Sequence, residues 1–293
     1  MITNDFKQKV IKAMAAARPN FYGSDAKFAV SLGISGSQYS RVKRGDTERV
    51  LSNGNWLTLA RTLGINPGSD TVWETANTPV YQFITAQLKV CQREGLSSLL
   101  CDYSDIGKSY AAQQYAKTHR NAVYIDCSQV KSKQKLIRRI AQLLGVDGTG
   151  RYADVYENLV FYIKTLPNPL IILDEAGDLQ HEAFLEIKAL WNATEHCCGY
   201  YMMGADGLQN KMRRSIDNRK VGYTELFSRF GKRYGKVIPA GDESKKILET
   251  TALMIIKANA PAGSDYNRIL RNTMGDDGRP SLRRIYNELA KHK

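Results

Sequence analysis

Residues 98–109 read Ser-Leu-Leu-Cys-Asp-Tyr-Ser-Asp-Ile-Gly-Lys-Ser, and this stretch decides the expected fold. Its apolar part predicts a short buried strand over 97–102, and a helix is expected to run from about residue 107 to residue 119. Phosphate-binding loops have the form GxxxxGK[ST] between a strand and a helix, and the Gly-Lys-Ser ending is intact here. Backbone N–H groups at the start of such a helix can cradle phosphate. The stretch therefore predicts a nucleotide-binding loop.

The residues of this loop have expected roles toward a nucleotide. Lys108 would reach the β- and γ-phosphates and assist catalysis, and Ser109 would ligate Mg²⁺. ATP and Mg²⁺ are accordingly the expected cofactors. The residues expected to contact the nucleotide are Asp102, Tyr103, Ser104, Asp105, Ile106, Gly107, Lys108, Ser109 and Tyr110.

Two acids depart from the usual loop pattern. Asp102 stands where the first glycine belongs, and Asp105 stands where many such loops carry another glycine. Aspartate tolerates a left-handed backbone better than most residues, so the shape of the loop can persist. Two carboxylates beside an anion cradle nevertheless oppose phosphate binding unless they point away. A chance Gly-Lys-Ser at a helix start therefore stays open as an alternative.

A second motif supports the nucleotide interpretation. Residues 170–175 read Leu-Ile-Ile-Leu-Asp-Glu, an apolar strand that ends in two acids. Asp174 would hold Mg²⁺ through water, and Glu175 would polarise the attacking water as a general base. Solvated acids at the end of a strand are the alternative. The order of this motif after Gly-Lys-Ser, with a helix-bearing crossover between them, favours a metal and catalytic role.

Strand and helix patterns alternate from about residue 80, which predicts a parallel sheet covered by helices. The expected strands are 97–102, 122–126, 170–174 and 199–204, and 236–239 is a possible fifth. The expected domains are a helix-turn-helix domain at 1–66, a linker at 67–79, an α/β core at 80–240 and a helical subdomain at 241–293.

The segment 28–41 has the spacing of a repressor-type helix-turn-helix. Ala29 is small where two helices would cross, Gly33 would make the turn, and Ile34 and Tyr39 would pack inward. Glutamine can contact adenine, and arginine can contact guanine or hold phosphate in a major groove. The residues expected to face DNA are Ser37, Gln38, Arg41, Lys43 and Arg44. A small helical domain that binds protein, or nothing, is the alternative.

The charge balance favours a polyanionic partner. The 293 residues include 42 Lys and Arg against 29 Asp and Glu, a net charge of +13. Such an excess is most often matched by nucleic acid. Two basic runs stand out in the α/β part, with Lys131 and Lys133 in one and Arg213 and Arg214 in the other. Phosphate contacts of this kind give sequence-independent, salt-sensitive affinity for DNA, and solvated helix faces are the alternative.

Several classes of protein are disfavoured by the sequence. It has no run of about 18 apolar residues, so no membrane span is expected. It lacks a secretory signal pattern, and its five cysteines are an odd number, so a disulfide framework is not expected. A cytoplasmic, nucleoid-associated protein is the expectation.

The two nucleotide motifs on a βαβ frame with a helical C-terminal part resemble the AAA+ ATPases over roughly residues 80–290. The resemblance implies an AAA+ P-loop parallel sheet with a small C-terminal helical domain, here preceded by an all-α helix-turn-helix domain. Residues 226–231, Leu-Phe-Ser-Arg-Phe-Gly, look like the family's Ser-Arg motif, which implies that Arg229 reaches the nucleotide of a neighbouring subunit. Arg283 resembles the family's second sensor. A surface or DNA-contacting role for Arg229 and an ordinary basic helix face for Arg283 stay open.

In domain order and size the chain resembles AAA+ target-capture ATPases of transposition, of the phage Mu B type. The resemblance implies subunits that polymerise with ATP as a helical filament or ring on double-stranded target DNA, and that deliver this DNA to a transposase. It implies slow ATP hydrolysis, stimulated by DNA or transposase. A helicase loader is one alternative. A nucleotide-dead helix-turn-helix regulator is another, favoured by Asp102, Asp105 and Ala205.

Overall fold

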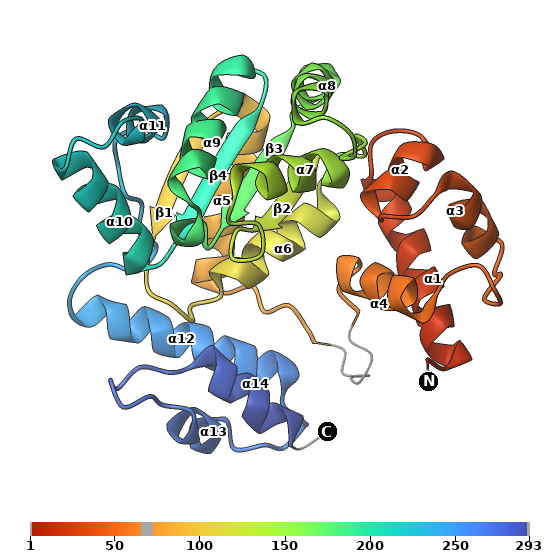
Figure 1. Cartoon of the computed structure of the whole chain (residues 1–293). Helices are drawn as coiled ribbons and strands as arrows, with labels where there is room; N and C mark the ends of the chain where they lie inside the picture. The colour runs from red at the N-terminus through yellow and green to blue at the C-terminus, as the bar shows by residue number, and fades with distance from the viewer. Residues whose placement is uncertain (1, 66–72, 292–293) are drawn as a thin grey trace.

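The structure is a computed structural model that describes residues 2–65 and 73–291. Figure 1 shows a group of N-terminal helices beside an α/β core, with a second group of helices packed against another side of that core. The part of the predicted linker at 67–72 lies outside the described residues. No helix within the described ranges is long and apolar enough to cross a membrane.

The N-terminal helices surround a small core of their own. Their starts follow from the sequence, because Thr3, Ser24, Ser35 and Ser52 each precede a helix and accept a hydrogen bond from a backbone N–H of its first turn. The fully buried Trp56 lies at the centre of this core. The helices are α1 (Asn4–Ala17), α2 (Asp25–Ser31), α3 (Gly36–Lys43) and α4 (Asn53–Thr62), with a 3₁₀ turn at Arg18–Asn20.

Four parallel strands form the central sheet in the order β1-β4-β3-β2. They are β1 (Ser97–Cys101), β2 (Ala122–Asp126), β3 (Leu170–Asp174) and β4 (Gly199–Gly204). Every residue of β3 and β4 is buried, as expected for inner strands covered on both faces.

The possible fifth strand at 236–239 does not form. Gly235 alone bridges to β1, where its N–H donates to the Leu99 carbonyl (2.8 Å) and its carbonyl accepts from the N–H of Cys101 (3.0 Å). The next backbone N–H groups, of Val237 and Ile238, donate to the carboxylate of Asp102 instead. Hydrogen bonds to the Asp102 side chain therefore take the place of further backbone hydrogen bonds to β1.

Helices cover both faces of the sheet because alternate strand residues point to opposite sides. One face packs against α5 (Pro79–Glu94) and α6 (Lys108–Thr118). The helices α7 (Lys133–Leu143), α8 (Tyr152–Thr165), α9 (His181–Ala193), α10 (Asp206–Asp217) and α11 (Tyr223–Arg229) belong to the other core. The C-terminal helices α12 (Asp242–Asn259), α13 (Tyr266–Asn272) and α14 (Leu282–Ala290) enclose a third, small core.

The N-terminal helices are docked on the α/β core through α2 and the 3₁₀ turn. The ammonium of Lys27 lies 3.2 Å from the ring centroid of Tyr162 on α8. The side-chain amide of Asn20 donates to the carbonyl of Lys117 on α6 (3.0 Å). Helix α2 also contacts α7. The N-terminal helices are therefore held against the α/β core by direct contacts.

Candidate nucleotide-binding site

The phosphate loop joins the end of β1 to the start of α6. Two of its residues have positive φ, Asp105 at 60° and Gly107 at 94°. Gly107 precedes α6 and supplies no side-chain cap, so the first N–H groups of the helix are not bonded by a capping side chain. Backbone donors at a helix start, with the positive end of the helix dipole, form an anion site.

Lys108 folds back over the loop. Its ammonium is buried and donates to the carbonyl of Asp102 (3.0 Å) and to the carbonyl of Tyr103. Burial lowers the pKa of Lys108, and the negative charges of nearby Asp102, Asp174 and Glu175 oppose that shift. A cation that is held beside the anion cradle suits contact with phosphate oxygens.

The carboxylate of Asp102 is buried and accepts hydrogen bonds from three backbone N–H groups. One oxygen accepts the N–H groups of Val237 (2.6 Å) and Ile238 (2.8 Å), and the other accepts the N–H of Tyr103 (2.8 Å). The residue is 2% exposed. This acid therefore connects the loop to the segment after Gly235. The backbone N–H groups at the start of α6 remain available to an anion.

The carboxylate of Asp105 also has a structural partner, on the C-terminal helices. It accepts a hydrogen bond from the hydroxyl of Ser281 (2.7 Å), and its other oxygen lies 3.9 Å from Nε of Arg283. The guanidinium of Arg279 stacks on the ring of Tyr103, 4.1 Å from its centroid. The loop is thus fastened to the start of α14, which is where the resemblance placed Arg283.

The acid pair lies at the end of β3. Asp174 is 1% exposed and accepts from the hydroxyl of Tyr124 (2.6 Å) and from the N–H of Glu175 (2.9 Å). Glu175 is exposed and has a left-handed backbone with φ of 48°. Although the residue as a whole is exposed, its carboxyl group is partly shielded from water, and this shielding, followed by the charge of Asp174, raises the pKa of Glu175. A raised pKa strengthens a carboxylate as a general base.

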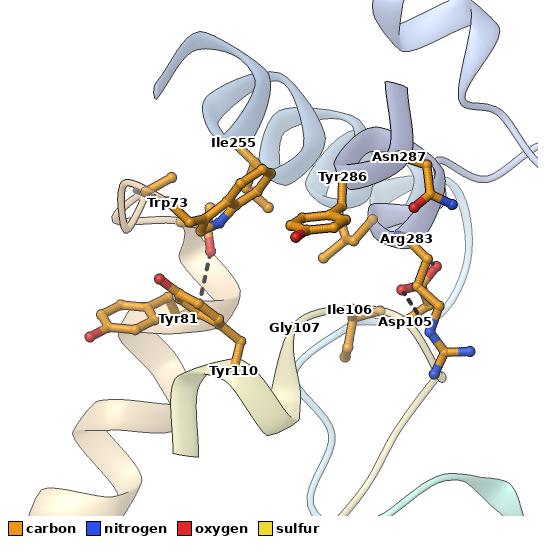
Figure 2. Close-up of a pocket in the computed structure, with 13 residues that line it drawn as sticks. Trp73, Tyr81, Asp105, Ile106, Gly107, Tyr110, Ile255, Arg283, Tyr286 and Asn287 are labelled. Atoms are coloured by element: carbon orange, nitrogen blue, oxygen red, sulfur yellow. Dashed lines mark hydrogen bonds and ion pairs between the residues drawn. The ribbon is translucent and has the colours of Figure 1, made fainter. Parts of the chain in front are cut away.

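A cavity of about 490 Å³ opens beside the loop, between the segment before α5, the start of α6 and the C-terminal helices. Figure 2 shows Trp73 and Tyr286 side by side in its lining, and their tilted rings are in contact, with centroids 5.2 Å apart. Flat aromatic rings beside a phosphate cradle suit a nucleoside base. The lining residues are Trp73, Ala76, Thr78, Tyr81, Asp105, Ile106, Gly107, Tyr110, Ile255, Leu282, Arg283, Tyr286 and Asn287.

The residues present fit Mg²⁺ and ATP. The cavity has room for a base, the start of α6 and Lys108 could contact phosphate, and Ser109 and Asp174 offer the hydroxyl and carboxylate oxygens that Mg²⁺ prefers. Sequence reasoning missed the aromatic lining by Trp73, Tyr81 and Tyr286. The one available signal was an aromatic residue inside an otherwise polar connecting segment.

Arg229 does not lie at its own chain's nucleotide site. At the end of α11, its Nε donates to Asn192 (2.7 Å), and its guanidinium stacks 5.4 Å from the ring centroid of Trp191. Trp191 in turn donates to the hydroxyl of Ser97, at the first residue of β1. Arg229 is therefore near the strand start, and the phosphate loop follows the strand end.

The residues expected to face DNA from α3 have partners within their own domain. The side chain of Gln38 closes a capping box with Ser35, so a contact with a base would require that box to open. Lys43 pairs with Asp25 (2.9 Å), and its charge still faces solvent. The remaining pairs are Arg41 with Asp46, Arg44 with the Ser40 carbonyl, and Ser37 with Ser35.

The two basic runs of the core flank the 3₁₀ turn Ala176–Asp178 that follows the acid pair. Lys131 lies 3.4 Å from Asp178 in an ion pair. Helix α10, which carries Arg213 and Arg214, packs against the same turn. Both of these arginines are exposed, whereas the neighbouring Lys211 donates to carbonyls of the turn and its C-cap. Lys133 is exposed, and its ammonium lies 5.7 Å from the Tyr152 ring centroid.

Comparison with known proteins agrees with this geometry. Residues 93–212 match the family model described as an AAA domain. With the four-stranded parallel sheet, this match confirms the predicted α/β AAA+ fold class.

Relatives at low identity are transposition proteins. The Mu-like prophage FluMu DNA transposition protein B of Haemophilus influenzae is 28% identical over 44% of this chain and 44% of its own length. The ATP-dependent target DNA activator B of Escherichia phage Mu is 26% identical over 70% of this chain and 64% of its own. The chain thus spans about half to two thirds of these relatives. A solved structure of Aeropyrum pernix Orc1 with DNA has a TM-score of 0.46 at 15% identity, over 75% of this chain and 66% of that one.

Proposed function

We propose, from the premise that residues 93–212 form an AAA domain, that this chain is an ATP-dependent DNA-binding protein of DNA transposition. In this proposal, subunits assemble with ATP on double-stranded target DNA, deliver it to a transposase and stimulate transposition. The observation that carries the proposal is the phosphate loop, because the carboxylates of both unusual acids accept hydrogen bonds from other parts of the chain. The names of the similar phage proteins point to the same process.

The chain's own residues suggest how ATP would be held and hydrolysed. The start of α6 and Lys108 would bind the phosphates, and Ser109 and Asp174 would hold the metal. Bound Mg²⁺ would neutralise charge on the β- and γ-phosphates. Glu175 would accept a proton from water as the water oxygen bonds to the γ-phosphorus, and the bond from that phosphorus to the bridging oxygen of the β-phosphate would break to release ADP. Arg229 of a neighbouring copy supplies positive charge to the transition state, so turnover is slow until subunits assemble.

DNA binding is assigned to the exposed basic residues. In this proposal Lys131, Lys133, Arg213 and Arg214 hold the phosphate backbone without regard to sequence, and α3 adds an accessory contact. The contacts of α3 come from its exposed residues Ser37, Lys43 and Arg44, with Gln38 and Arg41 able to join if their own hydrogen bonds open. Backbone contacts of this kind weaken steeply as salt rises.

Binding to random-sequence duplex DNA tests the proposal. The protein is titrated with ATP, with ADP and without nucleotide, at two salt concentrations, and phosphate release is recorded in parallel. Cooperative, salt-sensitive binding that requires ATP is expected, and the Lys108→Ala variant should lose it. Nucleotide-independent binding by the parent protein, or retained ATP-dependent assembly in Lys108→Ala, would overturn the assignment.

The alternative of a nucleotide-dead regulator loses part of its support. Three residues favoured it, Asp102, Asp105 and Ala205. The carboxylates of Asp102 and Asp105 accept hydrogen bonds from other parts of the chain, which weakens the argument that they repel phosphate and leaves that from Ala205 unchanged. No observation among the described residues specifically favours a helicase loader, which a co-purifying helicase would reveal.

A further inference from the structure

The hydroxyl of Tyr124 makes a contact with the acid pair that the nucleotide motifs do not include. Tyr124 lies in the middle of β2, and its backbone is in register with Ile172 of β3. Asp174 follows Ile172 by two residues, so both side chains point to the same face of the sheet. The long phenol spans this diagonal, and its hydroxyl donates to Oδ2 of Asp174 at 2.6 Å.

The carboxylate of Asp174 is thereby held from two sides. Its Oδ1 accepts the N–H of Glu175 (2.9 Å), while its Oδ2 accepts from Tyr124. Both donors are neutral, and the carboxylate is 1% exposed. The two donors fix the rotation of the carboxylate and leave lone pairs on both oxygens for a further ligand.

We infer that Tyr124 is a positioning residue that orients Asp174 toward the magnesium ion of bound nucleotide. The inference rests on the proposed function, because it assumes that the site takes Mg²⁺ with ATP. Outer donors to a metal-binding carboxylate fix its orientation, and their loss typically weakens metal affinity by about 10- to 100-fold. The contact of Tyr124 with the acid pair is its hydrogen bond to Asp174, so its effect on the metal would pass through that carboxylate.

The surroundings of Tyr124 make a conservative variant practical. The residue is half-buried and lines a cavity of about 480 Å³ between the N-terminal helices and the core. Phenylalanine keeps the ring and removes only the hydroxyl, at a residue that already lines a cavity, so the substitution should disturb the packing little. Tyr201 on β4 is a matched control, since its buried hydroxyl donates to the amide oxygen of Gln87 (2.6 Å) and does not contact the acid pair.

The test compares the full-length parent chain with Tyr124→Phe and Tyr201→Phe. A fluorescent ATP analogue is titrated in EDTA and over a range of Mg²⁺ concentrations, and thermal melting is measured in parallel. In EDTA the affinities of all three should agree. The Mg²⁺ concentration that half-saturates the metal-dependent gain should rise about tenfold in Tyr124→Phe alone.

Each result has a distinct meaning. An unchanged Mg²⁺ requirement in Tyr124→Phe, in a parent that shows metal-dependent binding, would overturn the inference and leave the nucleotide site standing. An equal change in Tyr201→Phe would likewise overturn it, because the effect would then be general loosening of the sheet. A parent that binds no nucleotide under either condition would overturn the proposed function and the inference together.

Discussion

The side chain of Asp102 binds the backbone of the segment after Gly235, where a strand would have been bound by backbone groups. Its carboxylate accepts the backbone N–H groups of Val237 and Ile238. In a fifth strand that continued from Gly235, the N–H of Val237 would have faced β1 and that of Ile238 would have pointed away, because alternate N–H groups lie on opposite sides of a strand. The arrangement also explains how an acid survives in an anion cradle, because its lone pairs and charge are directed into the protein. Asp105 uses the left-handed backbone that aspartate tolerates and directs its charge to Ser281.

Replacing Asp102 with the glycine that is usual in such loops should therefore destabilise the protein. Asp102→Gly removes the acceptor for three backbone N–H groups, so the free energy of unfolding should fall by about 1–3 kcal/mol, measured by urea denaturation. Asp102→Asn keeps one acceptor oxygen and should lose less. Equal stability of Asp102→Gly and the parent would contradict this account of the loop.

Glu175 should set the acid limb of the pH–rate profile. Its pKa is raised above the ordinary 4.5 by partial burial and the charge of Asp174, and only the ionised form can accept a proton. Turnover should thus fall on acidification at a higher pH than an ordinary glutamate would give. Glu175→Gln should lower phosphate release about 10²- to 10⁴-fold while ATP-dependent DNA binding persists. Loss of binding in that variant would point to a structural role.

At the scale of elements, the four strands follow closely from the sequence. Short apolar runs bounded by polar residues predicted 122–126, 170–174 and 199–204 with the observed bounds, and 97–102 with one residue too many. The base cavity was beyond sequence reasoning, because Trp73 and Tyr286 meet only after the C-terminal helices fold back on the loop. The failure of the fifth strand depends on a side chain more than a hundred positions away.

The start of α14 connects the C-terminal helices, which line one side of this cavity, to the phosphate loop. The hydroxyl of Ser281 accepts from the N–H of Arg284 and donates to Asp105. Ser281→Ala should cost about 1 kcal/mol of stability through the lost cap and also weaken nucleotide binding. Ser52→Ala removes a similar cap from α4 and should leave nucleotide affinity unchanged, as read by calorimetric titration. Equal affinities in both variants would argue against coupling.

At the scale of the whole molecule, the domain contact depends on Gly145. This glycine has φ of 78°, and a Cβ there would lie 2.7 Å from the carbonyl of Lys27 on α2. Gly145→Ala should separate the N-terminal helices from the core, seen as a larger radius in X-ray scattering. Gly150→Ala is the control. Gly150 has φ of 84°, but a Cβ there would meet no atom within 4 Å, so this variant adds backbone strain without a clash between the domains. Equal radii in the two variants would refute the role of Gly145.

The docked position of the N-terminal helices has one more consequence. Strand β2 is outermost in the sheet and pairs only with β3 among the described residues, and the N-terminal helices face it across the cavity that Tyr124 lines. An outermost strand with unpaired amides is a template on which other chains add strands and aggregate. We therefore expect the N-terminal helices to hinder strand addition at β2, and a fragment of the α/β core that lacks them to aggregate more readily.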